Sequence, residues 1–188
     1  MEHDLMILGE GPHAYEMAAI VARINHVTPS WRLLGRVASA AAVPDTCYVA
    51  FEHDFADAPE IDRSRWATLI DPSCFISPTA MIGPGCILYP NCFVGHQARL
   101  TERVFCLASA VINHHAIIGT RATICSGVCL AGHVEVGPRA YLGQASNIRQ
   151  HVRVGADSLI GMGAVVLHDV EPGMVVAGNP AVTLRKRT

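Results

Sequence analysis

Hydrophobic positions in this chain follow a period of six residues. From Ile70 to Glu171 the sequence divides into seventeen hexads without an insertion, and the first position of each hexad is Ile, Leu or Val, with Cys106 as the one exception. The fifth position is always Ala, Val, Ser or Cys. Such a long uninterrupted repeat predicts a stacked, repetitive structure rather than an ordinary mixed domain.

The hexad also predicts the local backbone. Side chains alternate in direction along a strand, so positions five and one point inward together if positions five, six, one and two are extended. Gly, Pro, Asn and Asp gather at positions three and four, where the chain must turn, as at Pro84-Gly85 and Pro90-Asn91. Three strands and three turns make a coil of 18 residues. The hexads therefore predict a triangular prism of nearly six coils of parallel β-structure.

Residues 1–66 lack the hexads and predict a small βαβ-type domain. Leu5–Leu8 is predicted as a strand and Ala14–Asn25 as a helix, and two further strands are predicted at Trp31–Val37 and Cys47–Phe51. The turn Gly9-Glu10-Gly11 would direct backbone N–H groups and a helix N-terminus toward an anion, with His13 close by. A tight turn without a ligand explains these glycines equally well. The predicted division is residues 1–66, the repeat over 67–171, and a tail over 172–188.

Composition restricts the class of protein. Half of the residues (51%) are hydrophobic and only 16% are charged, which is enough apolar surface for a large core. A net charge of −2 gives no general attraction to nucleic acid or to an anionic membrane. No apolar run reaches the roughly 18 residues of a membrane span, and no signal-peptide pattern opens the sequence, so we expect a cytoplasmic protein. The seven cysteines lack metal-site spacing, and we expect reduced thiols.

Six of the ten histidines fall in the repeat, and its period places all six on one edge of the prism. The third hexad position holds His96, His114 and His168, and the fourth holds His115, His133 and His151. The last three should stack on successive coils. Such an edge can be a solvated corner of turn residues, a catalytic and substrate-binding edge, or a metal site between subunits.

The hexads resemble those of the hexapeptide-repeat acyltransferases, which fold as a left-handed parallel β-helix. Four segments narrow the resemblance to the sialic-acid O-acetyltransferases and the bacterial nucleotide-aminosugar N-acetyltransferases: Asn113-His114, Ile117-Ile118-Gly119, Gly161-Met162-Gly163-Ala164 and Gly178-Asn179-Pro180-Ala181. The resemblance implies a mainly β fold, a left-handed β-helix preceded by a small α/β domain. It also implies acetyl-CoA as co-substrate and an amino sugar, linked to a nucleotide, as acceptor. It implies no metal.

The resemblance assigns roles to individual residues. In that family the histidine of an Asn-His-(Asp/Glu) motif is the general base, which is His114 here, with His115 as the second candidate catalytic residue. Residues implied to contact acetyl-CoA are Ala131, Gly132, Met162, Arg185 and Lys186. Residues implied to contact the acceptor are Gly9, Gly11, His13 and Asn113. For Arg185 and Lys186 the assignment rests on their charge, which could pair with the phosphates of coenzyme A, and a solvated C-terminal run of charge is the slightly better explanation.

The sequence departs from the family at the proposed base. His115 stands where an Asp or Glu is expected, and an imidazole cannot stabilise a protonated His114 as a carboxylate would. Either another carboxylate orients the base, or the base is weaker, or the chemistry has changed. The acidic pair expected at the end of the second strand is also absent, because the chain has Gly35-Arg36 there.

Outward positions on two of the three predicted faces are apolar. One face carries Phe75, Phe93, Val111 and Leu167, and the other carries Ile87, Tyr89, Phe105, Leu107, Tyr141 and Leu159. Exposed apolar stripes indicate partners, and the resemblance implies a homotrimer with active sites between prisms. Three alternatives stay open: a sugar O-acetyltransferase, a zinc protein like the γ-class carbonic anhydrases, and a catalytically silent scaffold.

Overall fold

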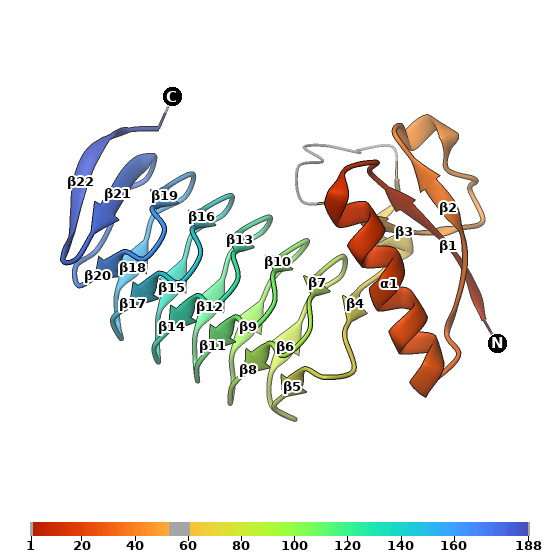
Figure 1. Cartoon of the computed structure of the whole chain (residues 1–188), viewed down its shortest axis with the longest axis horizontal. Coiled ribbons are helices and arrows are strands. Elements are labelled where there is room, and N and C mark those ends of the chain that lie inside the picture. The colour runs from red at the N-terminus through yellow and green to blue at the C-terminus, as the bar shows by residue number, and fades with distance from the viewer. Residues whose placement is uncertain (1, 53–60, 188) are drawn as a thin grey trace.

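The computed structural model describes residues 2–52 and 61–187, which form an N-terminal α/β unit at one end of a long β-helix (Figure 1). In the N-terminal unit, helix α1 (Pro12–Val27) accompanies a parallel sheet of order β2-β1-β3. Its strands are β1 (His3–Leu8), β2 (Trp31–Val37) and β3 (Tyr48–Phe51). The predicted βαβ pattern is therefore present. One short 3-10 helix, Ala40–Ala42, lies between β2 and β3, and a second, Arg63–Arg65, lies between β3 and the β-helix.

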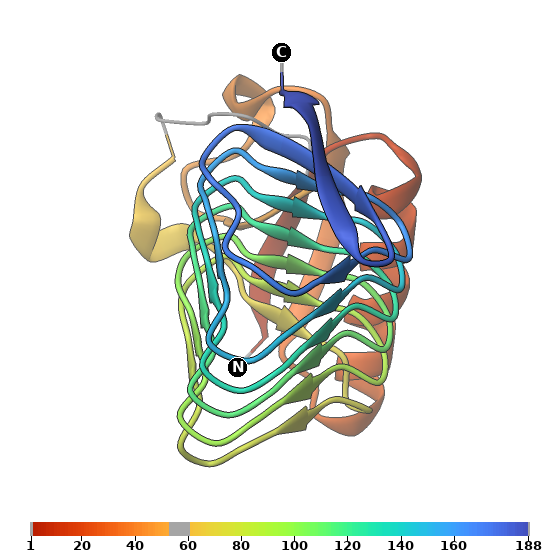
Figure 2. The same ribbon diagram turned by 90° about the vertical axis from the view of Figure 1, so that its left-hand side faces the viewer.

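The β-helix has three faces of parallel strands, and its coils superpose as triangular outlines when viewed from the C-terminal end (Figure 2). The first face consists of β4 (Leu69–Ile70), β7 (Ile87–Leu88), β10 (Phe105–Cys106), β13 (Thr123–Ile124), β16 (Tyr141–Leu142) and β19 (Leu159–Ile160). The second face consists of β5 (Phe75–Ile76), β8 (Phe93–Val94), β11 (Val111–Ile112), β14 (Cys129–Leu130), β17 (Asn147–Ile148) and β20 (Val165–Val166). The third face consists of β6 (Met81–Ile82), β9 (Arg99–Leu100), β12 (Ile117–Ile118), β15 (Glu135–Val136) and β18 (Arg153–Val154).

The register of the coils follows the hexads as far as β20, after which the pairs Val154 with Val170 and Leu159 with Val175 join residues 16 apart. Up to that point strand pairs join residues 18 apart, for example Val111 with Cys129 and Ile117 with Glu135. First-position residues such as Ile112 and Leu130 are fully buried on the axis, and fifth-position residues such as Ala116 and Val134 fill the space beside them. All seven cysteines are free thiols, as expected. Burial raises the pKa of the Cys86 thiol to about 11, which keeps it protonated and unreactive at neutral pH.

The corners impose one backbone conformation on the fourth hexad position. Eleven non-glycine residues there have φ between 53° and 64°, in the left-handed region, and His115, His133 and His151 are among them. Histidine is one of the residue types that tolerate this region better than most. Because these residues share one conformation on successive coils, their side chains leave the backbone in the same direction.

The N-terminal unit covers the first face of the earliest coils. Met17 and Ile20 of α1 belong to one buried cluster with Ile87, Tyr89 and Phe105 of the first face. Arg23 of α1 also donates to the buried Asp71 carboxylate, with Nε 2.5 Å from Oδ2. The expectation that this apolar face awaits a partner is therefore wrong for these coils, because the chain covers the face itself.

The second face exposes apolar side chains as predicted, whereas the third face departs in part from the predicted pattern. On the second face, Phe75 and Phe93 stack with ring centroids 5.0 Å apart and stay 55% and 37% exposed. The third face, which the sequence did not mark as apolar, exposes Met81 and Ile117 beside its charged residues.

Residues 172–188 were expected as a tail, but they continue the β-structure as far as they are described. Strand β21 (Met174–Gly178) extends the first face by pairing with β19, and β22 (Ala181–Lys186) returns antiparallel to it. This hairpin closes the end of the prism opposite α1 (Figure 1). Within the described residues, no helix has the length and apolar character needed to cross a lipid bilayer.

Candidate functional site

The histidines line the edge between the second and third faces, as the period predicts. His114 and His115 form the corner between β11 and β12, and His133 forms the equivalent corner between β14 and β15. The fourth-position rings stack as predicted: the His115 and His133 centroids are 4.6 Å apart, and those of His133 and His151 are 4.8 Å apart. Backbone hydrogen bonds hold this edge, since the His133 N–H donates to the His114 carbonyl at 3.0 Å.

The His114 ring lies directly against Gly132 on the next coil. A Cβ atom added to Gly132 would come within 2.4 Å of His114 Cε1 and 2.6 Å of Nε2, distances that real atoms do not reach. The ring can occupy this position only because residue 132 is glycine and has no Cβ atom. The structure therefore brings together two of the residues that the sequence singled out for different roles.

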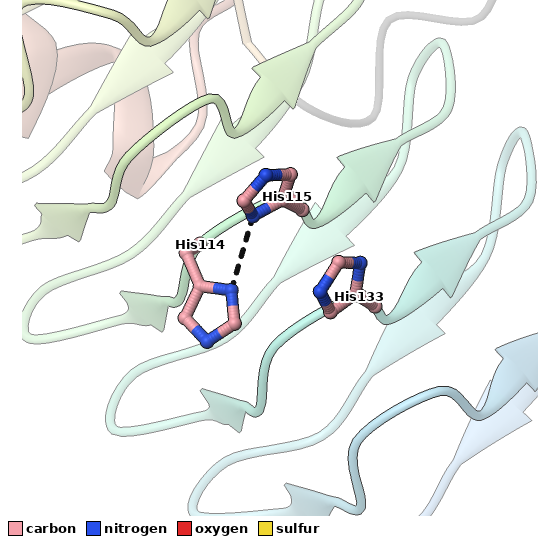
Figure 3. A group of neighbouring side chains, drawn as sticks. All are labelled: His114, His115 and His133. Atoms are coloured by element: carbon pink, nitrogen blue, oxygen red, sulfur yellow. Dashed lines mark hydrogen bonds between the residues drawn. The ribbon is translucent and has the colours of Figure 1, made fainter.

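His114 and His115 form a hydrogen bond through their rings. Their Nδ1 atoms are 3.1 Å apart, so one ring donates its N–H and the other accepts with its lone pair (Figure 3). Of the two arrangements, the one in which His114 donates leaves Nε2 of His114 without a proton and able to accept one. His115 is therefore placed to orient the His114 ring, although it is not an acid.

Neighbouring imidazoles affect His133. Burial, followed by the nearby His115, His151 and His114 rings, lowers the pKa of His133 below its usual value of 6.5. The neutral form of this ring is consequently favoured at neutral pH.

Asn113 and Ala131 flank the same corner, but their polar groups are engaged in the coils. The Asn113 side-chain amide donates to the Leu130 carbonyl at 2.8 Å, and the Ala131 N–H donates to the Ile148 carbonyl at 3.1 Å. Ala131 therefore has only its carbonyl to offer as a main-chain contact to a ligand. The amide of Asn113 braces the corner that carries His114.

The remaining candidates for acetyl-CoA contact lie elsewhere in the single chain. Met162 is 76% exposed at the corner between β19 and β20, which is a different edge of the prism from that of His114. Arg185 and Lys186 lie on β22, where both are exposed. One chain alone does not assemble these residues around His114.

The glycine turn after β1 binds a carboxylate of the chain itself. The Gly11 N–H donates to Glu52 Oε2 at 3.0 Å, and a Cβ atom on Gly9 would lie 2.3 Å from the same oxygen. His13 follows the turn, where its Nδ1 pairs with Glu16 and its carbonyl accepts from the Tyr89 hydroxyl. A ligand anion at this turn would compete with Glu52 for the Gly11 N–H.

Sequence reasoning missed Glu52 and a cavity beside the turn. Glu52 follows β3 directly, and the carboxyl ends of parallel strands meet at one edge of a sheet, so its proximity to the end of β1 could have been inferred. The cavity, about 570 Å³ in volume, is lined by Glu10, Tyr15, Leu33, Leu34, Gly35 and Arg36. The Arg36 guanidinium lies 3.5 Å from the centre of the Tyr15 ring. Tyr15 and Arg36 could have been noted from the sequence, because they lie near the ends of the predicted helix and the predicted second strand.

Comparison by sequence finds no relative: no protein-family model matches the chain, and no curated protein matches it. Comparison of the structure with solved structures does find similar proteins. The acetyltransferase domain of PglB from Neisseria gonorrhoeae FA1090 superposes with a TM-score of 0.84 at 22% identity, covering 97% of this chain and all of that domain, and a second structure of it holds acetyl coenzyme A.

Two further similar structures are N-acyltransferases. PerB from Caulobacter crescentus, in complex with CoA and GDP-perosamine, gives a TM-score of 0.78 at 21% identity, covering 96% of this chain and 97% of PerB. AntD from Bacillus cereus, in complex with dTDP and 3-hydroxybutyryl-CoA, gives 0.59 at 14% identity over 64% of this chain and 80% of AntD. At these identities the likeness establishes the fold: the chain is a left-handed parallel β-helix preceded by a small α/β unit, as the sequence predicted.

Proposed function

We propose that this protein transfers the acetyl group of acetyl-CoA to the amine of a nucleotide-linked amino sugar, with His114 as the general base. The observation that carries the proposal is the His114 corner: an exposed imidazole lies on Gly132, and a hydrogen bond from a second ring can fix its tautomer. The likeness to PglB and PerB, which extends over nearly the whole chain, supports the same reading.

The proposed reaction is a direct transfer. The acceptor nitrogen attacks the thioester carbonyl, and Nε2 of His114 takes the proton that this nitrogen loses. The new C–N bond forms as the C–S bond breaks, and the departing thiolate receives the proton from His114, which restores the base. General-base assistance of this kind typically contributes about 10²–10⁴-fold.

In this scheme His115 is a positioning residue. As a neutral ring it accepts from Nδ1–H of His114 and holds Nε2 free. When His115 gains a proton at Nδ1, His114 must accept through its own Nδ1, and its remaining proton then sits on Nε2. Protonation of either ring therefore removes the base, and we expect acid to inactivate the enzyme.

We place the nucleotide in the cavity lined by Glu10, Tyr15 and Arg36. It lies at the carboxyl end of the parallel strands and beside the N-terminus of α1, where phosphates are commonly bound in α/β folds. Gly9 and Gly11 flank the lining residue Glu10 in the sequence, and Arg36 supplies a cation for a phosphate. The His13 ring packs against Tyr89 and Phe105, and its role in acceptor binding stays a prediction. Asn113 remains our candidate at the acceptor end.

We propose that the active unit is a homotrimer of cytoplasmic protein. Support comes from the exposed Phe75–Phe93 stack and from His114, which is exposed in one chain and needs a second wall. A neighbouring prism would bring its own Met162 corner, and its Arg185 and Lys186, toward the His114 edge. A fully active monomer in sedimentation experiments would contradict this arrangement.

Product analysis tests the function. Purified protein is incubated with acetyl-CoA and separate UDP-, GDP- and dTDP-linked amino sugars, and mass spectrometry detects the addition of one acetyl group. Acceptors that carry only a hydroxyl at the same carbon distinguish N- from O-acetylation. No product with any amino sugar, or equal turnover by His114→Ala, would refute the proposal.

A further inference from the structure

Three imidazoles on the His114 edge form a cluster that is larger than the acetyl transfer requires. His114, His115 and His133 each offer one ring nitrogen, and these three nitrogens all lie within 4.8 Å of one another. Figure 3 shows the three rings around a common space, with one nitrogen of each directed toward it. His115 alone is sufficient to orient His114, so the transfer scheme leaves His133 without a role.

The backbone holds the three donors in place. His115 and His133 have φ angles of 60° and 59° on consecutive coils, and their N–H groups donate to the carbonyls of His96 and His114 at 2.8 and 3.0 Å. The side chains themselves lie at the surface, so small rotations of the rings can bring the nitrogens closer. The backbone positions are therefore fixed, while the ring nitrogens can adjust to an ion.

The donor set has a defined chemistry. Neutral imidazole is a ligand for Zn²⁺, Ni²⁺ and Cu²⁺, whereas Ca²⁺ and Mg²⁺ prefer oxygen ligands. Three protein ligands with one open position are a common zinc arrangement. His96 is not part of this group, and its Nδ1 pairs with the Thr79 hydroxyl at 2.8 Å.

We propose that His114, His115 and His133 bind one borderline transition-metal dication, with Zn²⁺ as the reference ion, and that the bound ion inhibits the enzyme. Each imidazole gives one nitrogen lone pair to the ion, and any proton on that nitrogen passes to water. Coordination through Nε2 of His114 occupies the basic atom itself. Coordination through Nδ1 leaves the ring proton on Nε2. In both cases His114 can no longer accept a proton from the acceptor amine.

The ion-binding half of this inference is independent of the proposed function, whereas the inhibitory half rests on it. Binding is therefore measured first, with Zn²⁺ alone, by calorimetry on the full chain, and with Co²⁺, whose visible absorption reports coordination by nitrogen. We expect one ion per chain. His133→Asn, which keeps a side chain suited to positive φ, should weaken binding at least tenfold. His168→Asn, on the same edge three coils away from His114, should bind as the wild type does.

A second measurement needs no variant and so serves if a variant folds poorly: the NMR signals of the histidine rings in the wild-type protein. On addition of Zn²⁺ the signals of His114, His115 and His133 should shift, and those of His26 should not. Equal Zn²⁺ affinity of His133→Asn and the wild type would overturn the site. So would the absence of stoichiometric binding.

Inhibition is measured next, by mass spectrometry of the acetylated product rather than by thiol release, since Zn²⁺ also binds the CoA thiol. Stoichiometric Zn²⁺ should suppress transfer by the wild type and by His168→Asn, while His133→Asn keeps its metal-free rate. Equal suppression of His133→Asn would assign the effect to CoA and overturn the inhibitory role. Stoichiometric binding in a protein without transferase activity would leave the metal site standing and refute the proposed function alone.

Discussion

Replacing His115 by Asp should restore the charge that the His114 corner lacks. His115 has φ of 60°, a conformation that Asp and Asn adopt readily, so both substitutions fit the backbone. A carboxylate at this position lies next to His114, whose Nδ1 is now 3.1 Å from that of His115. The negative charge favours the protonated form of His114, which is the form that the transfer step creates.

The size of the effect follows from the exposure of the corner. At a separation of about 4 Å in a water-like dielectric, two unit charges interact by about 1 kcal/mol. This equals roughly a fivefold change in equilibrium, or about 0.7 pH unit. We therefore expect the acid limb of the kcat/KM profile of His115→Asp to move to higher pH by about 0.7 unit relative to His115→Asn.

The assay is a pH profile of kcat/KM for acetyl transfer at low ionic strength, repeated at about 1 M salt, where screening should remove most of the difference. His115→Asn is the matched control, because it keeps the turn and the hydrogen-bonding group without the charge. Identical profiles for the Asp and Asn variants at low salt would show that protonation of His114 does not limit the rate, and the reasoning above would fail.

Three further predictions concern the same edge and its frame. Gly132→Ala places a methyl group where the His114 ring lies, so we expect kcat to fall by about 10²-fold. Tm should change little, because the exposed ring can rotate outward. An unchanged kcat would show that this ring position is not the active one. The pKa of His133 is lowered, so the unfolded chain binds more protons as the pH falls through 6.5, and the free energy of unfolding should be smaller at about pH 5 than at about pH 7.5. Urea denaturation at the two values checks this, and His133→Asn should show a smaller difference than the wild type. Ile124→Ala removes a fully buried axial side chain and should cost about 2–5 kcal/mol of unfolding free energy, measured by the same method, whereas a loss below about 1 kcal/mol would contradict the packed axis.

The β-helix and the histidine edge could be predicted because both depend on the period alone. An uninterrupted repeat of 18 residues per coil determines which residues become neighbours, so the stacking of His115, His133 and His151 follows without knowledge of any side-chain contact. The Gly132 contact with His114 follows in the same way, because the two residues are 18 positions, or one coil, apart. Handedness came from the family resemblance, since period does not determine it.

What the sequence did not reveal depends on contacts outside the repeat. Outward Ile87 and Phe105 look the same in sequence whether α1 or another subunit covers them. The hairpin of β21 and β22 follows Pro172-Gly173, a pair that ordinarily signals the end of regular structure. The sequence could place Glu52 at the same sheet edge as the glycine turn, but its hydrogen bond to Gly11 follows only from the strand order, in which β3 lies next to β1. Each of these depends on packing between segments with no common period.

The central claim is that His114 removes the acceptor's proton, and one comparison tests it most directly. Wild-type protein and His114→Asn are each saturated with acetyl-CoA, and a single turnover to the best amino-sugar acceptor is followed by rapid quench and mass spectrometry. We predict a transfer rate about 10²–10⁴-fold lower in the variant, with unchanged affinity for CoA. Equal single-turnover rates in the two proteins would contradict the assignment of His114 as the base.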